Sequence, residues 1–193
     1  MGLARRYSEN EVSRLLKRSE DAAVVGSGGR GHAESLHELR AVGAGRRSTT
    51  TDDLMERILA EAKAETSAFD GTQVEAVTFA LNSAAGLNAL TILANRSVSD
   101  VMAFIAVGAQ NFRMVRAVRD KHGPVRPGRL DLYLCMWEPA TASHVAMKLM
   151  KASPEALHIR TAYPMAAPPT GCTALSSLAR YTPAGGMAQR HEI

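Results

Sequence analysis

Cysteine is scarce in this chain of 193 residues, which contains only Cys135 and Cys172. The two form no CxxC pair, and no histidine stands near either of them to complete a zinc-binding set. A chain of this length can bury a core without disulfides or a structural metal. We therefore expect two ordinary thiols, one domain and no bound metal ion.

Aromatic residues are also few, at 5% of the chain, whereas proteins that bind single strands by base stacking need several aromatic platforms. Uninterrupted apolar runs are lacking too. The most apolar segment, residues 74–94, has the length of a membrane span but contains Glu75 and several other polar residues. No basic-then-apolar signal peptide opens the chain, and Arg6 stands where myristoylation requires Ser or Thr. We expect a soluble chain that does not insert into a membrane.

Positive charge is in slight excess, with 23 Lys and Arg against 19 Asp and Glu and a sequence pI of about 9.3. This balance favours a polyanionic partner but is modest for a dedicated DNA-binding protein. The basic residues gather between residues 113 and 129 and again between residues 40 and 47. Candidate contacts to a nucleic-acid backbone are Arg46, Arg47, Arg113, Arg116 and Arg119. For the stretch from 113 to 129, a solvated surface is the alternative interpretation.

Helices are predicted throughout the N-terminal half. Two capping boxes mark helix starts, one formed by Ser8 and Glu11 and the other by Thr72 and Glu75. Apolar residues follow at helical spacing in each case, and Gly86 is placed to divide the last helix. The predicted helices span residues 8–20, 32–40, 48–66 and 73–94.

Strands are predicted in the C-terminal half, where short apolar and aromatic runs are bounded by Gly and Pro. Residues 98–118 fit a helix and a strand equally well. From residue 166 onward Pro, Gly, Ser, Thr and Ala dominate, which is typical of an irregular tail. The predicted strands span residues 130–137, 144–150 and 157–163, the last ending at Pro164. The expected fold class is α+β, with helices first and an antiparallel sheet second.

A glycine-rich loop precedes His32. Its spacing, at Gly26, Gly28 and Gly31, matches the GxGxxG pattern of dinucleotide-binding turns. The sequence lacks the second strand and the acidic residue of that fold, and a histidine stands where a phosphate-binding P-loop needs lysine. We therefore expect no nucleotide cofactor.

His32 opens the helix after this loop, where backbone N–H groups and the helix dipole attract an anion. A histidine in such a place can act as general base on a phosphate-linked ribose. His37 lies too far round the helix to share a face with His32, but it does share one with Arg40. We expect one histidine to act chemically and the other to pack. Two surface histidines are the alternative.

Thr161 and Tyr163 form the second candidate pair, on the last predicted strand. In a regular strand they point to one side, while His158 and Arg160 face the other way. Two neutral hydroxyl donors aimed at one spot suit the oxygens of a phosphate whose charge grows in a transition state. Structural packing on an edge strand is the alternative.

This ordered set resembles the ribonuclease-A-like toxin domains found at the C-termini of bacterial contact-dependent inhibition proteins and other polymorphic toxins. Those domains show a glycine-preceded histidine, a second histidine five residues later, an arginine, a Ser/Thr-rich helix start and a strand that closes in Thr-Ala-Tyr-Pro. The chain has the same elements in order over residues 28–166, with His32, His37, Arg40, residues 48–52 and residues 161–164. It departs from the family's pattern at Glu38, where a small apolar residue is usual, and in a shorter spacing to the arginine. Arg46 or Arg47 is therefore an alternative to Arg40.

The resemblance implies a ribonuclease-like α+β domain over residues 28–166, an N-terminal helix and linker over 1–27, and an irregular tail over 167–193. It implies metal-independent cleavage of RNA by its own 2′-hydroxyl, with a histidine as base or acid and with an arginine, Thr161 and Tyr163 holding the phosphate. A cognate immunity protein would be the partner of a monomeric toxin domain, delivered within a larger toxin and acting in the target-cell cytoplasm. The alternative function is a non-catalytic basic module that binds nucleic acid or protein.

Overall fold

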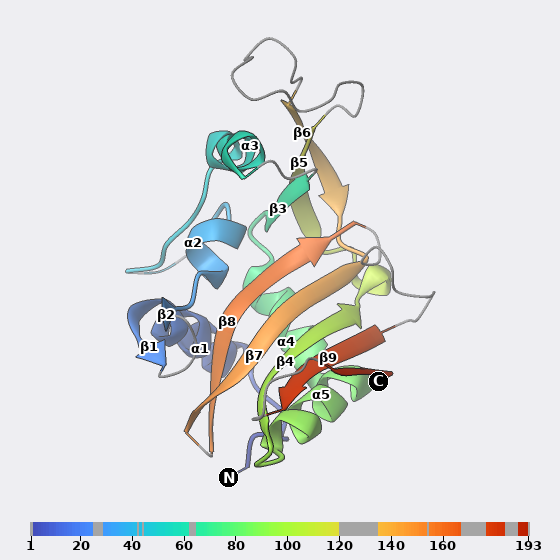
Figure 1. Ribbon diagram of the computed structural model, residues 1–193. Coiled ribbons are helices and arrows are strands. Elements are labelled where there is room, and N and C mark those ends of the chain that lie inside the picture. Colours follow the sequence, from blue (N-terminus) through green and yellow to red (C-terminus); the bar gives the residue numbers. More distant parts are fainter. Residues whose placement is uncertain are drawn as a thin grey trace.

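The computed structural model describes residues 2–24, 29–41, 43, 45–61, 65–119, 135–153, 155–166, 177–183 and 189–192. Helices dominate its N-terminal half, and antiparallel sheets follow (Figure 1), so the predicted α+β class is confirmed. The helices are α1 (Glu9–Asp21), α2 (Ala33–His37), α3 (Thr51–Ala60), α4 (Gln73–Asn82) and α5 (Ala84–Ala94), with a short 3-10 helix η1 (Gly108–Gln110).

The strands fall into three antiparallel groups. A small hairpin pairs β1 (Ala23–Val24) with β2 (Gly29–Arg30). A three-stranded sheet has the order β3 (Glu65–Phe69), β5 (Arg113–Arg119) and β6 (Cys135–Thr141). The large sheet has the order β10 (Gln189–Glu192), β9 (Ser177–Pro183), β4 (Val98–Ala106), β7 (His144–Ser153) and β8 (Ala156–Met165).

The main core lies between one face of the large sheet and the helices. Alternate residues of β4, Val101, Ala103 and Ile105, are buried in the same cluster as Leu16 of α1 and Leu90 of α5. Helices α4 and α5 lie behind this sheet in Figure 1. The intervening residues of β4 point to the opposite face, as the strand period of two requires. That face is the one that carries the candidate site.

The small sheet packs against α3 and meets the large sheet at β8. Leu54 and Ile58 of α3 contact Ala68 and Val115 in a separate buried cluster. The Ser67 hydroxyl of β3 donates to the Pro164 carbonyl of β8 over 2.6 Å. This bond fixes the position where the two sheets come together.

Several helix predictions need correction. The third helix ends at Ala60, and part of the segment assigned to it forms β3 instead. The last predicted helix breaks at Ser83 rather than Gly86, and α4 and α5 meet at 74°. The Thr72 hydroxyl does not cap α4, because it donates to the Arg113 carbonyl 2.9 Å away.

The strand predictions differ from the structure mainly near the C-terminus. The ambiguous segment 98–118 forms two strands, β4 and β5. Strand β8 continues through Pro164, which is tolerated because β8 lies at the edge of its sheet. The segment predicted to be irregular contributes β9, which pairs with β4 inside the sheet, and β10. Of the strand predicted at 130–137, residues 130–134 lie outside the described part of the chain, as does Cys172.

The predicted N-terminal helix and the predicted C-terminal tail both contribute residues to the main fold. Leu15 and Leu16 of α1 are core residues, and Ala179 of β9 is fully buried in the same cluster. Within the described residues no single helix is long and apolar enough to cross a membrane. The bent pair α4 and α5 reaches that length and composition only when both helices are taken together.

Candidate active site

Close packing at Gly31 brings His32 against β8. The Gly31 N–H donates to the Ser19 carbonyl over 2.7 Å. A Cβ atom at this position would lie 2.8 Å from that carbonyl oxygen and 3.0 Å from the Ile159 oxygen, so only glycine fits between α1 and β8. The next N–H, that of His32, donates to the Arg160 carbonyl over 3.0 Å.

A carboxylate from α1 caps the short helix α2. His32 occupies the N-cap position, but its side chain makes no capping hydrogen bond. The buried Glu20 carboxylate supplies that bond instead, since its Oε1 accepts from the backbone N–H groups of Glu34 at 2.7 Å and Ser35 at 3.1 Å. Glu20 thus satisfies the first-turn donors and leaves the His32 imidazole out of the cap.

His37 lies in fixed contact with both sheets. Its Nδ1 is 2.8 Å from the Ser67 carbonyl oxygen, and because a carbonyl only accepts, Nδ1 carries a proton. In the neutral ring Nε2 is then the unprotonated nitrogen. The His37 ring centroid is 6.1 Å from that of His32 and 5.1 Å from that of Tyr163. The structure therefore brings both predicted histidines together with the predicted tyrosine.

Thr161 and Tyr163 share the sheet face that α4 and α5 do not cover. They pair with Lys148 and Ala146, which alternate along β7, and Tyr163 packs with Phe104 and Ala146. Thr161 is only 9% exposed, and its Oγ1 has no hydrogen-bond partner among the described residues. Burying such a hydroxyl without a partner costs about 1–3 kcal/mol, and a bound ligand would recover this cost by supplying the missing hydrogen bond.

The Tyr163 hydroxyl stays protonated. Burial raises the pKa of Tyr163, and the nearby Arg180 guanidinium of β9 opposes that rise only in part. Arg180 also lies over the Phe104 ring, 5.3 Å from its centroid. A neutral phenol donor and a cation therefore lie close together on this face.

A bulge in β8 changes the direction of His158. The register pairs Met150 with His158, Leu149 with Ile159 and Lys148 with Thr161, so one residue of β8, Arg160, is left over. His158 therefore lies on the same face as Thr161. The prediction that His158 faces the opposite way, which assumed a regular strand, is wrong.

The three arginines that follow α2 have different surroundings. Arg46 is buried, with a side chain only 7% exposed that pairs with the Glu34 carboxylate and donates to Ser13 Oγ. This geometry is that of a structural ion pair rather than a ligand contact. The Arg40 side chain is 71% exposed and pairs with Asp70 at 2.7 Å. Arg47 is half exposed, 3.9 Å from Glu20.

The predicted basic stretch on β5 does not form one surface. Arg113 and Arg116 are an odd number of positions apart in a strand, so they point to opposite faces. Arg116 pairs with Glu138 of β6. Arg113 lies by the turn at Gly71, where an added Cβ would be 3.7 Å from its Nη2 and 3.8 Å from the Arg40 Cβ. The Arg119 side chain and residues 120–134 lie outside the described part of the chain.

Two buried residues that were not among the predicted site residues hold α2 in place. The Glu38 carboxylate accepts from the backbone N–H groups of Arg40, Gly71 and Gln73 at 2.8, 2.9 and 3.1 Å. The Gln73 side-chain amide donates to the carbonyls of Ala33 at 2.7 Å and Ala162 at 3.3 Å. Glu38, the departure from the family's pattern, therefore anchors the end of α2 to the turn between β3 and α4.

The chemistry of this site has to be inferred from its own side chains. Comparisons with protein-family models, curated proteins and solved structures give no match. Among the described residues no three or more His, Cys, Asp and Glu side chains are grouped so that they could hold a metal ion. Two imidazoles beside two hydroxyls can transfer protons and donate hydrogen bonds to an oxyanion.

Proposed function

We propose that this chain is an endoribonuclease that cleaves RNA by transesterification. The ribose 2′-oxygen forms a bond to the adjacent phosphorus, the bond from phosphorus to the 5′-oxygen of the next nucleotide breaks, and a 2′,3′-cyclic phosphate remains. The observation that carries the proposal is the grouping of the His32, His37 and Tyr163 rings on the sheet face that also carries the Thr161 hydroxyl, for which the described residues provide no hydrogen-bond partner.

His37 is the proposed general base. Its Nδ1–H is held by the Ser67 carbonyl, which orients the ring and stabilises the imidazolium that forms when Nε2 takes the 2′-hydroxyl proton. His32 is the proposed general acid that protonates the departing 5′-oxygen. Ring centroids 6.1 Å apart allow one phosphate to lie within reach of both imidazoles.

Thr161 and Tyr163 are the proposed donors to the non-bridging phosphate oxygens. Because burial keeps the pKa of Tyr163 raised, its hydroxyl has a proton to donate at neutral pH. Arg180 is the cation proposed to offset the phosphate charge, since it lies near enough to Tyr163 to influence its ionisation. In this proposal Arg180 takes the place of Arg40, whose guanidinium pairs with Asp70, and of the alternative Arg46, whose guanidinium pairs with Glu34.

The proposed reaction needs no metal ion, because the substrate supplies its own nucleophile and the histidines move both protons. The resemblance to bacterial toxin domains supports a further proposal about the biological role of the chain. The chain would be a monomeric toxin domain delivered within a larger toxin, it would act in the target-cell cytoplasm, and an immunity protein would block it in the cell that makes it.

The test is incubation of the purified chain with a defined RNA in the presence of EDTA, followed by analysis of the product ends. We expect 2′,3′-cyclic phosphates, no cleavage of an oligonucleotide with 2′-deoxyribose at every position, and loss of cleavage in His37→Ala. Intact RNA under all conditions would overturn the proposal. Salt-dependent RNA binding without products would favour the non-catalytic binding module.

A further inference from the structure

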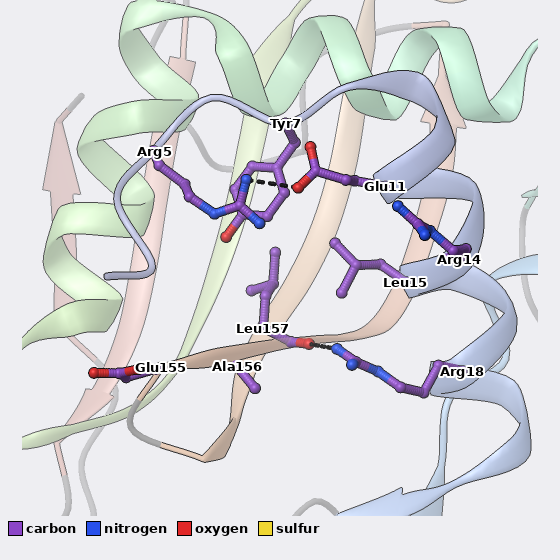
Figure 2. Close-up of a pocket in the computed structure, with 9 residues that line it drawn as sticks. All are labelled: Arg5, Tyr7, Glu11, Arg14, Leu15, Arg18, Glu155, Ala156 and Leu157. Atoms are coloured by element: carbon purple, nitrogen blue, oxygen red, sulfur yellow. Dashed lines mark hydrogen bonds and ion pairs between the residues drawn. The ribbon is translucent and has the colours of Figure 1, made fainter. Parts of the chain in front are cut away.

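Arg18 of α1 lies between two cavities beside the beginning of β8. The larger, of about 530 Å³, is shown in Figure 2, and the smaller has a volume of about 340 Å³. Both are lined by Arg18 and Leu157. The Arg18 guanidinium is held there, because its Nη2 donates to the Leu157 carbonyl over 3.2 Å.

The lining of the smaller cavity is basic. Arg18, Lys151 and His158 contribute to it, and no carboxylate does so among its described lining residues. Arg18 forms no ion pair with a carboxylate in the described part of the chain, and the Lys151 ammonium donates to the Asn95 carbonyl at 2.7 Å. Basic groups gathered without a counter-charge favour the binding of an anion.

The larger cavity adds to this charge on one side. Arg14, one helical turn before Arg18, lines it, and its Nε donates to the Asn10 carbonyl at 3.2 Å. Of the two carboxylates in that lining, Glu11 is already paired with Arg5 at 2.8 Å, whereas Glu155 lies at the far edge in Figure 2. The positive charge is thus concentrated toward Arg18.

His158 provides an independent indication of a ligand. The residue is 3% exposed, and its Nε2 is buried without a hydrogen-bond partner among the described residues. Burial lowers the pKa of His158, and the guanidinium groups of Arg160 and Arg18 lower it further, so the neighbouring positive charges act directly on this imidazole. An anion between these groups would supply the missing counter-charge.

The basic cluster formed by Arg18, Lys151 and His158 lies farther along β8 from the proposed active site. Positions 158 and 161 lie on one sheet face and are separated by about 10 Å at the rise of a strand. His32 contacts β8 between these two positions, because its backbone N–H donates to the Arg160 carbonyl. A polyanion that places one phosphate at Thr161 can therefore place another at Arg18.

We propose that Arg18, Lys151 and His158 form a second phosphate site, which holds a neighbouring phosphodiester of the single-stranded RNA bound at Thr161 and Tyr163. The inference rests on the proposed function only in naming RNA as the source of that phosphate. The proximity of the cluster to β8 favours a nucleic-acid strand over a lipid headgroup or an acidic protein.

The experiment measures binding of a single-stranded 2′-deoxyoligonucleotide, which cannot be cleaved through a 2′-hydroxyl. The double variant Arg18→Gln/Lys151→Gln is expected to bind about tenfold more weakly at low salt, and its slope of log affinity against log salt should be smaller by roughly 1. Lys17→Gln is the matched control, because Lys17 neighbours Arg18 on α1 but pairs with Asp21. Its affinity should stay within about twofold of the wild type, as the surface pair it belongs to is weak.

Equal affinities and slopes for the double variant and the wild type would overturn the inference, as would an equal loss in Lys17→Gln. A second measurement does not depend on the folding of a variant. Titration of the wild-type chain with the oligonucleotide should move the NMR signals of the His158 imidazole, and unmoved signals contradict the site.

Failure of the proposed function gives a different result. If the wild-type chain leaves RNA intact but the double variant loses oligonucleotide affinity, the ribonuclease proposal falls and the second phosphate site stands. If the wild type cleaves RNA and the double variant binds as tightly as the wild type, only the second site falls.

Discussion

The His37 and Tyr163 ring centroids lie 5.1 Å apart, although the two residues are far apart in the sequence. His37 ends the short helix α2, and Tyr163 lies on the edge strand of the large sheet. The Ser67 carbonyl holds one ring, and the Phe104 cluster holds the other. A second imidazole, that of His32, has its centroid 6.1 Å from that of His37. The imidazoles can transfer protons, and the phenol can donate a hydrogen bond.

Replacing either histidine by alanine should strongly reduce RNA cleavage without unfolding the chain. General acid–base catalysis contributes about 10²–10⁴-fold, so His32→Ala and His37→Ala should each lower kcat by at least about 10². Cleavage of a defined RNA and thermal unfolding by circular dichroism are the measurements. Ser35→Ala, on the same helix, is the control and should retain activity. Full activity in both histidine variants would contradict their assigned roles.

Thr161→Val should change stability and activity in opposite directions. The substitution replaces a buried hydroxyl that has no partner among the described residues by a methyl group of similar shape. Removing such a group should stabilise the fold by about 1 kcal/mol, whereas the loss of a donor to the phosphate should lower kcat by about 10²-fold. Urea unfolding and RNA cleavage measure the two effects. A variant that is both less stable and fully active would refute the interpretation of Thr161.

Tyr163→Phe separates the hydroxyl from the ring. The phenyl ring keeps its contact with His37, so stability should change little, while cleavage should fall by about 10-fold or more. The product ends of a defined RNA and urea unfolding are again the measurements. Unchanged cleavage would reduce Tyr163 to a packing residue.

Local signals in the sequence predicted the features that depend only on residues close together in the chain. Ser8 and Glu11 form the predicted capping box of α1. Thr161 and Tyr163 lie on one face of a strand because their spacing of two is unaffected by the bulge that precedes them. Residue type and spacing were sufficient in both cases.

The remaining features depend on contacts that spacing does not encode. The bulge at Arg160 turns His158 to the face of Thr161, and no residue in that segment marks it. Strand β9 has no continuous apolar or aromatic run to mark it in the sequence, and it pairs with the edge of β4. Glu20 and Glu38 look like solvated helix residues, yet each is buried against backbone N–H groups of a distant segment.

The cap that Glu20 provides should be needed for activity. Glu20→Ala removes the acceptor of the Glu34 and Ser35 N–H groups and should cost about 0.5–2 kcal/mol, with a loss of cleavage because the first turn of α2, of which His32 is the N-cap residue, loses its cap. Glu20→Gln is the matched variant, since its amide oxygen can accept the same two bonds, and it should retain most of the cleavage. Equal activity of the alanine variant and the wild type would show that the cap does not position His32.

Stability should depend on pH through Glu38. Burial raises the pKa of Glu38, although the three backbone N–H groups oppose the shift. A carboxyl whose pKa is raised in the folded state binds its proton more tightly than in the unfolded chain, so this contribution is fully present below the unfolded pKa and is lost as pH rises through the raised value. Glu38→Gln removes the titrating group. The free energy of unfolding of the wild type minus that of Glu38→Gln, measured in urea, should therefore fall as pH rises from the ordinary carboxyl range. A difference that increases over that range would contradict the raised pKa.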